Sequence, residues 1–341
     1  MRRYRDRFRP WEYLLFSAVT LGVGCLCLCV GSVSLPLGDV LAAVKALPGR
    51  QEAAGLADSI LSLRLPRVIC AALSGAALSL SGAAMQGLLK NPLADGSTLG
   101  VSSGASLGAV IAIAFSLRFP GLAMASTTAM AILFAFLSLL IILALTYKLD
   151  GSLSTNTIIL IGVIFSMFMS SLLSIVVTLA PEKLRSITFW TMGSLQSASY
   201  TDVLLLLGAT VIFGGIILAH ARELNAFAIG EENARHIGVD VKRVKLLILI
   251  TVSGLIGICV SVAGTIGFVG LVTPHMVRLL VGPNHRRLLS ASVFGGAVFL
   301  MLADLAARTV LSPRELPIGV VTSLVGAVVF IFIFYRSGRG R

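Results

Sequence analysis

Long apolar stretches alternate with short polar segments along the whole chain. Stretches that lack Asp, Glu, Lys and Arg cover residues 13–38, 68–89, 96–117, 119–147, 151–181, 203–219, 246–277, 288–303 and 316–335. A helix needs about 20 residues to cross the hydrocarbon core of a bilayer. Most of these stretches therefore predict one membrane-spanning helix each.

Two of the stretches depart from this simple pattern. The stretch 246–277 is too long for one ordinary span and contains several glycines, which predicts two helices with a turn near Ala263–Gly267. The stretch 288–303 ends at Asp304, but we expect its helix to continue to about Val310. The pattern predicts an all-α membrane protein with about ten transmembrane helices, folded as a single polytopic permease-like domain over residues 1–341.

The composition agrees with a membrane protein. Hydrophobic residues make up 57% of the chain and charged residues 12%, which is about half the charged fraction of an ordinary soluble domain. The polar residues of such a chain are too few to cover its apolar surface, so lipid must solvate most of it.

The basic residues predict the orientation. Ten spans place both termini on one side, and about two thirds of the 27 lysines and arginines fall on that side. Because basic loops stay in the cytoplasm, we expect a multi-pass membrane protein with cytoplasmic termini. The net charge of +12 then reflects topology and contact with anionic lipid, and no nucleic-acid partner is expected.

One charged segment stands apart from this pattern. The sequence Gly230-Glu-Glu-Asn-Ala-Arg-His-Ile-Gly238 lies between two long apolar stretches and is expected in the cytoplasm. The chain contains no G-x-x-x-x-G-K-[ST] loop for nucleotide phosphates. The segment therefore predicts a docking surface for a soluble partner that supplies energy, and this chain is expected to have no enzymatic activity and no cofactor of its own.

Small residues recur at helical spacing in the second and third predicted spans. Such stripes allow helix backbones to approach closely in lipid, where van der Waals contact drives association. The glycines that we expect at helix contacts are Gly75, Gly87, Gly100, Gly104 and Gly108.

Two interpretations are open for the acid deep in the ninth span. Asp304 precedes Arg308 by one helical turn. The pair is either a relay for protons or cations, or an i, i+4 ion pair near the outer end of the span, and we favour the ion pair.

Two other sequence features, a possible serine nucleophile and the cysteines, are not expected to form a catalytic or metal site. Gly100-Val-Ser-Ser-Gly104 matches the nucleophile pattern G-x-S-x-G, but the four histidines are expected at the cytoplasmic ends of other spans, which disfavours a membrane serine hydrolase. The cysteines lie inside predicted spans without a metal-binding spacing, so no metal site is expected.

Several segments in one order resemble a known family. They are Leu63-Arg-Leu-Pro-Arg67, Gln86-Gly-Leu-Leu-Lys-Asn-Pro-Leu-Ala-Asp95, Leu99-Gly-Val-Ser-Ser-Gly104, Trp190-Thr-Met-Gly-Ser194, Ala228-Ile-Gly-Glu-Glu-Asn-Ala-Arg235, Gly267-Phe-Val-Gly-Leu-Val-Thr-Pro-His275 and Glu315-Leu-Pro-Ile-Gly-Val320. The chain resembles the FecCD-type permeases of ABC importers for ferric siderophores, haem and cobalamin, from about residue 12 to 336.

The resemblance implies a type II importer permease of the bacterial cytoplasmic (inner) membrane, which forms a homodimer or pairs with a paralogue. It implies two separate ATP-binding subunits that use ATP and Mg²⁺, an extracytoplasmic binding protein and a metal-chelate substrate. It also implies that residues of about 222–243 couple the permease to the ATPase. The coupling residues carried over are Gly230, Glu231, Glu232, Ala234, Arg235 and Gly238.

The resemblance further implies roles at both membrane faces. Arg64, Arg67 and Arg308 match arginines that dock the binding protein, and Thr155 and Asn156 match the inner gate of the translocation path. Thr155 and Asn156 are equally suited to cap a helix. The alternative function is an ion-coupled secondary transporter that works without an ATPase.

Overall fold

The computed structural model describes residues 8–31, 35–36, 38, 40, 56–119, 126–151 and 153–338, and in these ranges the regular structure is entirely helical. The longer helices are α1 (Pro10–Cys29), α3 (Leu56–Leu88), α4 (Val101–Ala114), α5 (Ser126–Leu149), α6 (Thr155–Leu179), α8 (Tyr200–Ala209), α12 (Val241–Ala263), α13 (Val269–Val281), α14 (His285–Thr309) and α15 (Ile318–Gly338). The shorter ones are η1 (Gly96–Leu99), η2 (Pro181–Lys183), α7 (Leu184–Thr191), η3 (Thr210–Gly214), α9 (Gly215–Ala219), α10 (Ala221–Ala228) and α11 (Glu231–His236).

The helices coincide with the predicted spans. Seven helical segments are long and apolar enough to cross a membrane, and three shorter apolar helices accompany them. α12 ends at Ala263 and α13 begins at Val269, which confirms the turn expected in the long stretch. α14 continues past Asp304 to Thr309, as expected. Ten membrane crossings and cytoplasmic termini stay predictions.

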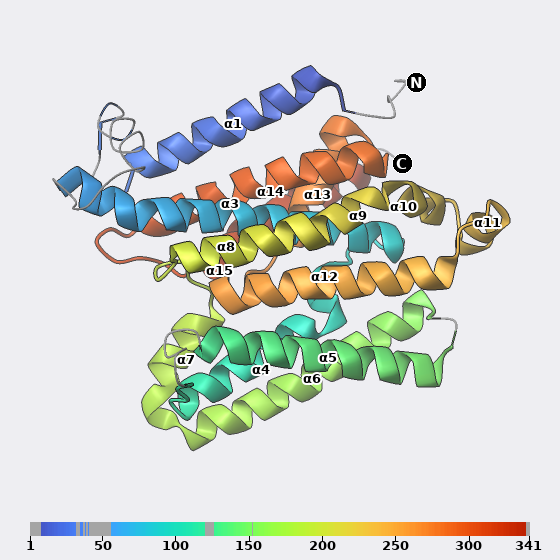
Figure 1. Ribbon diagram of the computed structural model, residues 1–341, viewed down its shortest axis with the longest axis horizontal. Helices are drawn as coiled ribbons and strands as arrows, with labels where there is room; N and C mark the ends of the chain where they lie inside the picture. Colours follow the sequence, from blue (N-terminus) through green and yellow to red (C-terminus); the bar gives the residue numbers. More distant parts are fainter. Residues whose placement is uncertain are drawn as a thin grey trace.

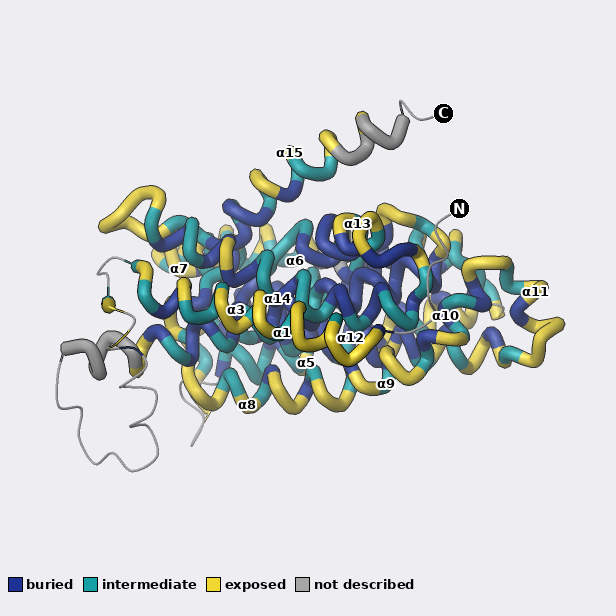
Figure 2. The backbone as a smooth tube through the Cα atoms, turned by 90° about the horizontal axis from the view of Figure 1, so that it is seen from above, coloured by how far each residue is buried: buried dark blue, intermediate teal, exposed yellow. Residues whose placement is uncertain are grey.

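The bundle has two distinct ends (Figures 1 and 2). α7 lies at one end, and α10 and α11 project at the other, together with the start of α1 and the end of α15. We refer to these as the α7 end and the α11 end. α12 packs against α3 on one side and against α4 and α5 on the other, so it joins the two halves of the bundle.

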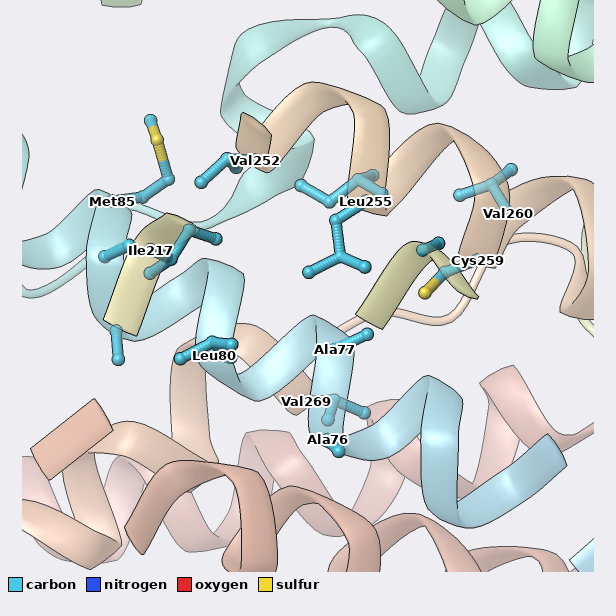
Figure 3. Packing of buried hydrophobic residues seen from close by; sticks show 14 of the residues in the cluster. Ala76, Ala77, Leu80, Met85, Ile217, Val252, Leu255, Cys259, Val260 and Val269 are labelled. Carbon is cyan, nitrogen blue, oxygen red and sulfur yellow. The ribbon is translucent and has the colours of Figure 1, made fainter. Parts of the chain in front are cut away.

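α3 is the central helix. In its membrane-crossing part 78% of the residues are buried, against 11% in α1, and Figure 2 shows the contrast in colour. Leu80 and Met85 of α3 belong to one buried hydrophobic cluster with Leu255 of α12 and Val269 of α13 (Figure 3). This helix therefore depends on contacts with protein, whereas α1 faces the surroundings.

Glycines set the distances at which α3 meets its neighbours. A Cβ atom on Gly75 would lie 2.2 Å from the carbonyl oxygen of Gly296 in α14, and one on Gly82 would lie 1.9 Å from the carbonyl oxygen of Gly270 in α13. Both contacts are closer than any side chain allows, so the backbones touch directly.

The other glycines singled out in the sequence also lie at close contacts. A Cβ on Gly87 would meet the ring of His285, and Cβ atoms on Gly104 and Gly108 would meet Ser138 and the backbone of Met130 in α5. Gly100 has a φ of +79°, a left-handed conformation that glycine adopts without strain.

Three loops at the α7 end are joined through their backbones. Ser194 N–H donates to the carbonyl of Ala263, while the N–H groups of Ile318 and Gly319 donate to the carbonyls of Gly193 and Met192. These bonds satisfy the polar ends of α7, α12 and α15, which lipid could not do.

A test of the central contact is the substitution Gly75→Ala. The new methyl group must push α3 away from α14, so we expect a loss of about 1–3 kcal/mol in the free energy of unfolding. Gly22→Ala in α1 is the matched control, because no atom lies within 4 Å of the added Cβ. Thermal unfolding in detergent measures both, and equal stability of the two variants would contradict the contact's importance.

Candidate functional site

α11 is a short charged helix held out at one end of the bundle. It lies between α10 and α12, and glycines in positive-φ conformations flank it, Gly230 at +120° and Gly238 at +90°. Ala234 is fully buried, and its N–H donates to the carbonyl of Gly230. The glycines allow the chain to turn sharply into and out of the helix, and Ala234 fixes it to the body of the protein.

The outward face of α11 is mixed in character. Glu232, Asn233, Arg235 and His236 are exposed, and Ile237 behind them is 64% exposed. Within the described residues neither Glu232 nor Arg235 forms an ion pair. Both charge signs and an apolar side chain are thus available to another protein.

Glu231 has a different role, because it faces inward. Its Oε1 lies 2.7 Å from Nζ of Lys245 in α12, and that lysine is fully buried. The same ammonium group donates a hydrogen bond of 2.8 Å to the carbonyl of Leu153. Sequence reasoning missed Lys245, since it is one of three basic residues within 242–245 and the pattern does not distinguish it from its exposed neighbours.

The start of α6 lies next to this ion pair. Ser154 is the N-cap, and its hydroxyl accepts from the N–H of Thr157. The carboxylate of Asp150 accepts from the N–H of Ser154 and from the hydroxyl of Thr157. Because Ser154 is the N-cap, neither Thr155 nor Asn156 caps the helix. In the first turn of α6, Thr155 is half-buried and Asn156 is exposed.

An exposed polar stripe continues along α6. The hydroxyls of Ser171, Ser174 and Thr178 are exposed, and each donates to the carbonyl one turn earlier. Such self-bonded hydroxyls can face either water or an apolar group at little cost. This surface suits the lining of a path better than a catalytic site.

At the α7 end, buried charges form a network. Arg67 lies 2.9 Å from Oδ1 of Asp304 and 2.9 Å from Oε2 of Glu315. Nε of Arg308 lies 3.0 Å from Oδ2 of Asp304, which confirms the i, i+4 ion pair favoured from the sequence. Asp304 itself is only 1% exposed, so two arginines balance one buried carboxylate.

The same arginines also tie α1 to the bundle. Arg308 donates to the carbonyl of Cys27, and Arg64 donates to the carbonyl of Leu28, both at 3.1 Å. Arg64, Arg67 and Arg308 are each less than a tenth exposed. The structure thus brings the three together, but as internal partners of the fold and not as a free basic surface.

The comparisons with known proteins agree with one another over most of the chain. Residues 19–336 match the FecCD transport family. The chain is 42% identical to YvrB, an uncharacterised ABC transporter permease protein of Bacillus subtilis, over 99% of this chain and 95% of that one. It is 40% identical to the cobalamin import system permease protein BtuC of Halobacterium salinarum (80% and 72% covered). It is 34% identical to the molybdate import system permease protein MolB of Haemophilus influenzae (96% and 94% covered).

A solved structure shares the fold. It is described as an inward-facing conformation of a metal-chelate type ABC transporter, and it matches with a TM-score of 0.84 and 30% identity, over 96% of this chain and 100% of the other. The helical arrangement described above is therefore that of a transporter permease.

The charge network generates a prediction. Arg67→Glu would place a third carboxylate beside Asp304 and Glu315, and breaking a buried pair costs about 3–5 kcal/mol. We expect loss of folded protein, measured as the monodisperse fraction in size-exclusion chromatography. Arg314→Glu, at an exposed arginine of the same end, is the control and should fold normally. A stable Arg67→Glu variant that only binds its partner poorly would assign Arg67 to docking alone.

Proposed function

The chain belongs to the FecCD transport family, and we propose that it is the membrane permease of an ATP-driven importer that carries a metal chelate inward. In this function a separate ATPase binds the α11 end, which then faces the cytoplasm. An extracytoplasmic binding protein delivers the substrate to the α7 end. The chain itself performs translocation and no hydrolysis.

The observation that carries the proposal is the exposed face of α11. The exposed charges of Glu232 and Arg235 on α11, with Ile237 directly after it, are unsuited to a lipid environment, and α11 projects from the end of the bundle. The sequence has no loop that could cradle nucleotide phosphates. A partner that docks on α11 and hydrolyses ATP accounts for both facts.

A second copy of the chain, or a paralogue, would complete the path. α6 exposes a long face from Asn156 to Thr178 with large apolar residues such as Met167 and Phe168 beside the hydroxyl stripe. Two such faces opposite one another would enclose a mixed apolar and polar channel. Thr155 and Asn156 would stand at its inner mouth.

The substrate is proposed as a metal chelate of the iron-siderophore, haem or cobalamin class. The structural relative is described as a metal-chelate transporter, and one sequence relative is named for cobalamin. Another is named for molybdate, so the family's cargo varies and an oxyanion belongs in any substrate test.

The outer arginines fit the proposal as supports of a docking edge. Glu315, with a side chain 34% exposed, stands at the surface and is held by Arg67. Arg64 and Arg308 fix the end of α1 beside it. Charged groups that are pre-positioned in this way favour rapid, salt-sensitive association with a binding protein.

The alternative function, an ion-coupled carrier, would need an ionisable group inside the membrane, and the candidate for that group is Asp304. Asp304 is paired with Arg67 and Arg308, so it contributes to an internal ion-pair network of the fold.

Reconstitution tests the proposal. The permease should be purified with the ATPase and binding protein that accompany it, placed in liposomes, and supplied with a ferric siderophore, haem, cobalamin or molybdate. We expect uptake of one chelate that requires ATP on the side of the liposome membrane where the ATPase is bound. Uptake that persists without the ATPase and disappears with the ion gradient would establish the secondary transporter instead.

The docking face gives a more local prediction. Glu232→Ala/Arg235→Ala removes two exposed charges and no internal contact, so we expect normal folding but an ATPase affinity reduced by about tenfold, or ~1.4 kcal/mol. Pull-down of the ATPase at increasing salt measures it. Lys148→Ala, an exposed basic residue at the same end outside α11, should bind like the unchanged chain; equal losses in both variants would reject α11 as the docking site.

A further inference from the structure

We propose that Lys245 is a positioning residue that ties the ATPase-docking helix α11 to the entrance of α6, so that movement of one displaces the other. The inference rests on the proposed function, and it assigns a role to a residue that faces neither partner nor substrate. Glu231 correspondingly acts inside the protein and not at the docking surface.

Three chain segments meet at one ammonium group. Nζ of Lys245, on α12, lies 2.7 Å from Oε1 of Glu231 on α11 and 2.8 Å from the carbonyl oxygen of Leu153. Leu153 immediately precedes Ser154, the N-cap of α6. A single side chain therefore bridges the docking helix and the turn that begins the proposed gate helix.

Because Lys245 is buried, breaking the bridge that it forms is energetically costly. The side chain of Lys245 is 0% exposed, so water cannot replace either partner if α11 and the turn move apart. An unpaired buried ammonium is strongly unfavourable, and the three groups must therefore move together or keep their spacing by other adjustments. Because separating these groups would leave the Lys245 ammonium unpaired, a movement of α11 is transmitted to the turn before α6.

The turn at Leu153 is connected by hydrogen bonds to the start of α6, so we expect the two to move as one unit. Leu153 is buried with a φ of +54°, an uncommon conformation for a side chain of this size. Its N–H donates to the carbonyl of Asp150, and the carboxylate of Asp150 holds Ser154 and Thr157. A pull on the Leu153 carbonyl is thus passed to the first turn of α6.

A neighbouring contact anchors α12 on the other side of this turn. Nζ of Lys242 lies 4.5 Å from the ring centroid of Tyr147 near the end of α5. α12 consequently holds both sides of the connection between α5 and α6, while Arg243 points outward to pair with Asp240 at 2.9 Å.

The first experiment separates a mechanical link from simple stabilisation. In Lys245→Met/Glu231→Leu the buried ammonium and its partly exposed carboxylate partner are both replaced by apolar groups, which typically preserves or raises stability. We expect this variant to fold and to bind the ATPase, but the substrate transported per ATP hydrolysed should fall by about tenfold, within the range of ordinary coupling between sites. Lys245→Met alone should lose the same coupling, with a lower thermal stability.

The control removes an ion pair outside the coupling segment. Glu12→Gln/Arg287→Gln abolishes the pair between α1 and α14 and should leave transport per ATP unchanged. If Lys245→Met/Glu231→Leu also transports with unchanged coupling, the pair only stabilises the fold and the proposal is overturned.

A second measurement requires no change at Lys245. Spin labels at His236→Cys and Asn156→Cys, both exposed positions, report the spacing of α11 and α6 after the five native cysteines are replaced by alanine. We expect that spacing to stay constant between nucleotide states, while the spacing from Asn156→Cys to Arg314→Cys at the α7 end changes. A variable first distance or a constant second one contradicts the link.

Failure of the link and failure of the proposed function are distinguishable. If the unchanged permease with its ATPase shows no ATP-dependent uptake of any chelate or of molybdate, the proposed function is wrong. If it transports but the variants keep their coupling, only the role of Lys245 is wrong.

Discussion

Direct backbone contact between helices is the interaction on which the rest of this structure depends. In lipid there is no hydrophobic gain from bringing two apolar helices together, so close packing must supply the attraction. At Gly75 and Gly296, and again at Gly82 and Gly270, α3 approaches its neighbours until main-chain atoms touch. This places α3 at the centre and determines where every helix around it can lie.

Two ion-pair networks lie at the two ends of this close-packed body. At one end Asp304 is balanced by Arg67 and Arg308, and at the other Lys245 is balanced by Glu231. Each site contains a buried charge, Asp304 at one end and Lys245 at the other, and in each the charged groups come from more than one helix. The charges therefore join helices at their ends, where the glycine contacts of the membrane interior no longer hold them.

The helices could be predicted from the sequence, whereas the roles of most charged residues could not. Apolar length alone located the spans, and clustered glycines located the break after Ala263. By contrast, Arg67 meets its partners across 237 and 248 residues of chain, which no local pattern reveals. Expected as a surface group, it lies inside the fold. Glu231 likewise differs from its neighbour Glu232 only through the tertiary position of Lys245. α7 was missed because its eight residues are too few to stand out as an apolar stretch.

The joined loops of the α7 end have a consequence for how such proteins diverge. The bonds among Gly193, Ala263 and Ile318 run between main-chain atoms, so most substitutions leave them intact. The tie at the α11 end runs through side chains and is lost by a single change at Lys245 or Glu231. The α7 end therefore tolerates side-chain substitutions that keep the main chain in place, whereas the α11 end can be changed residue by residue.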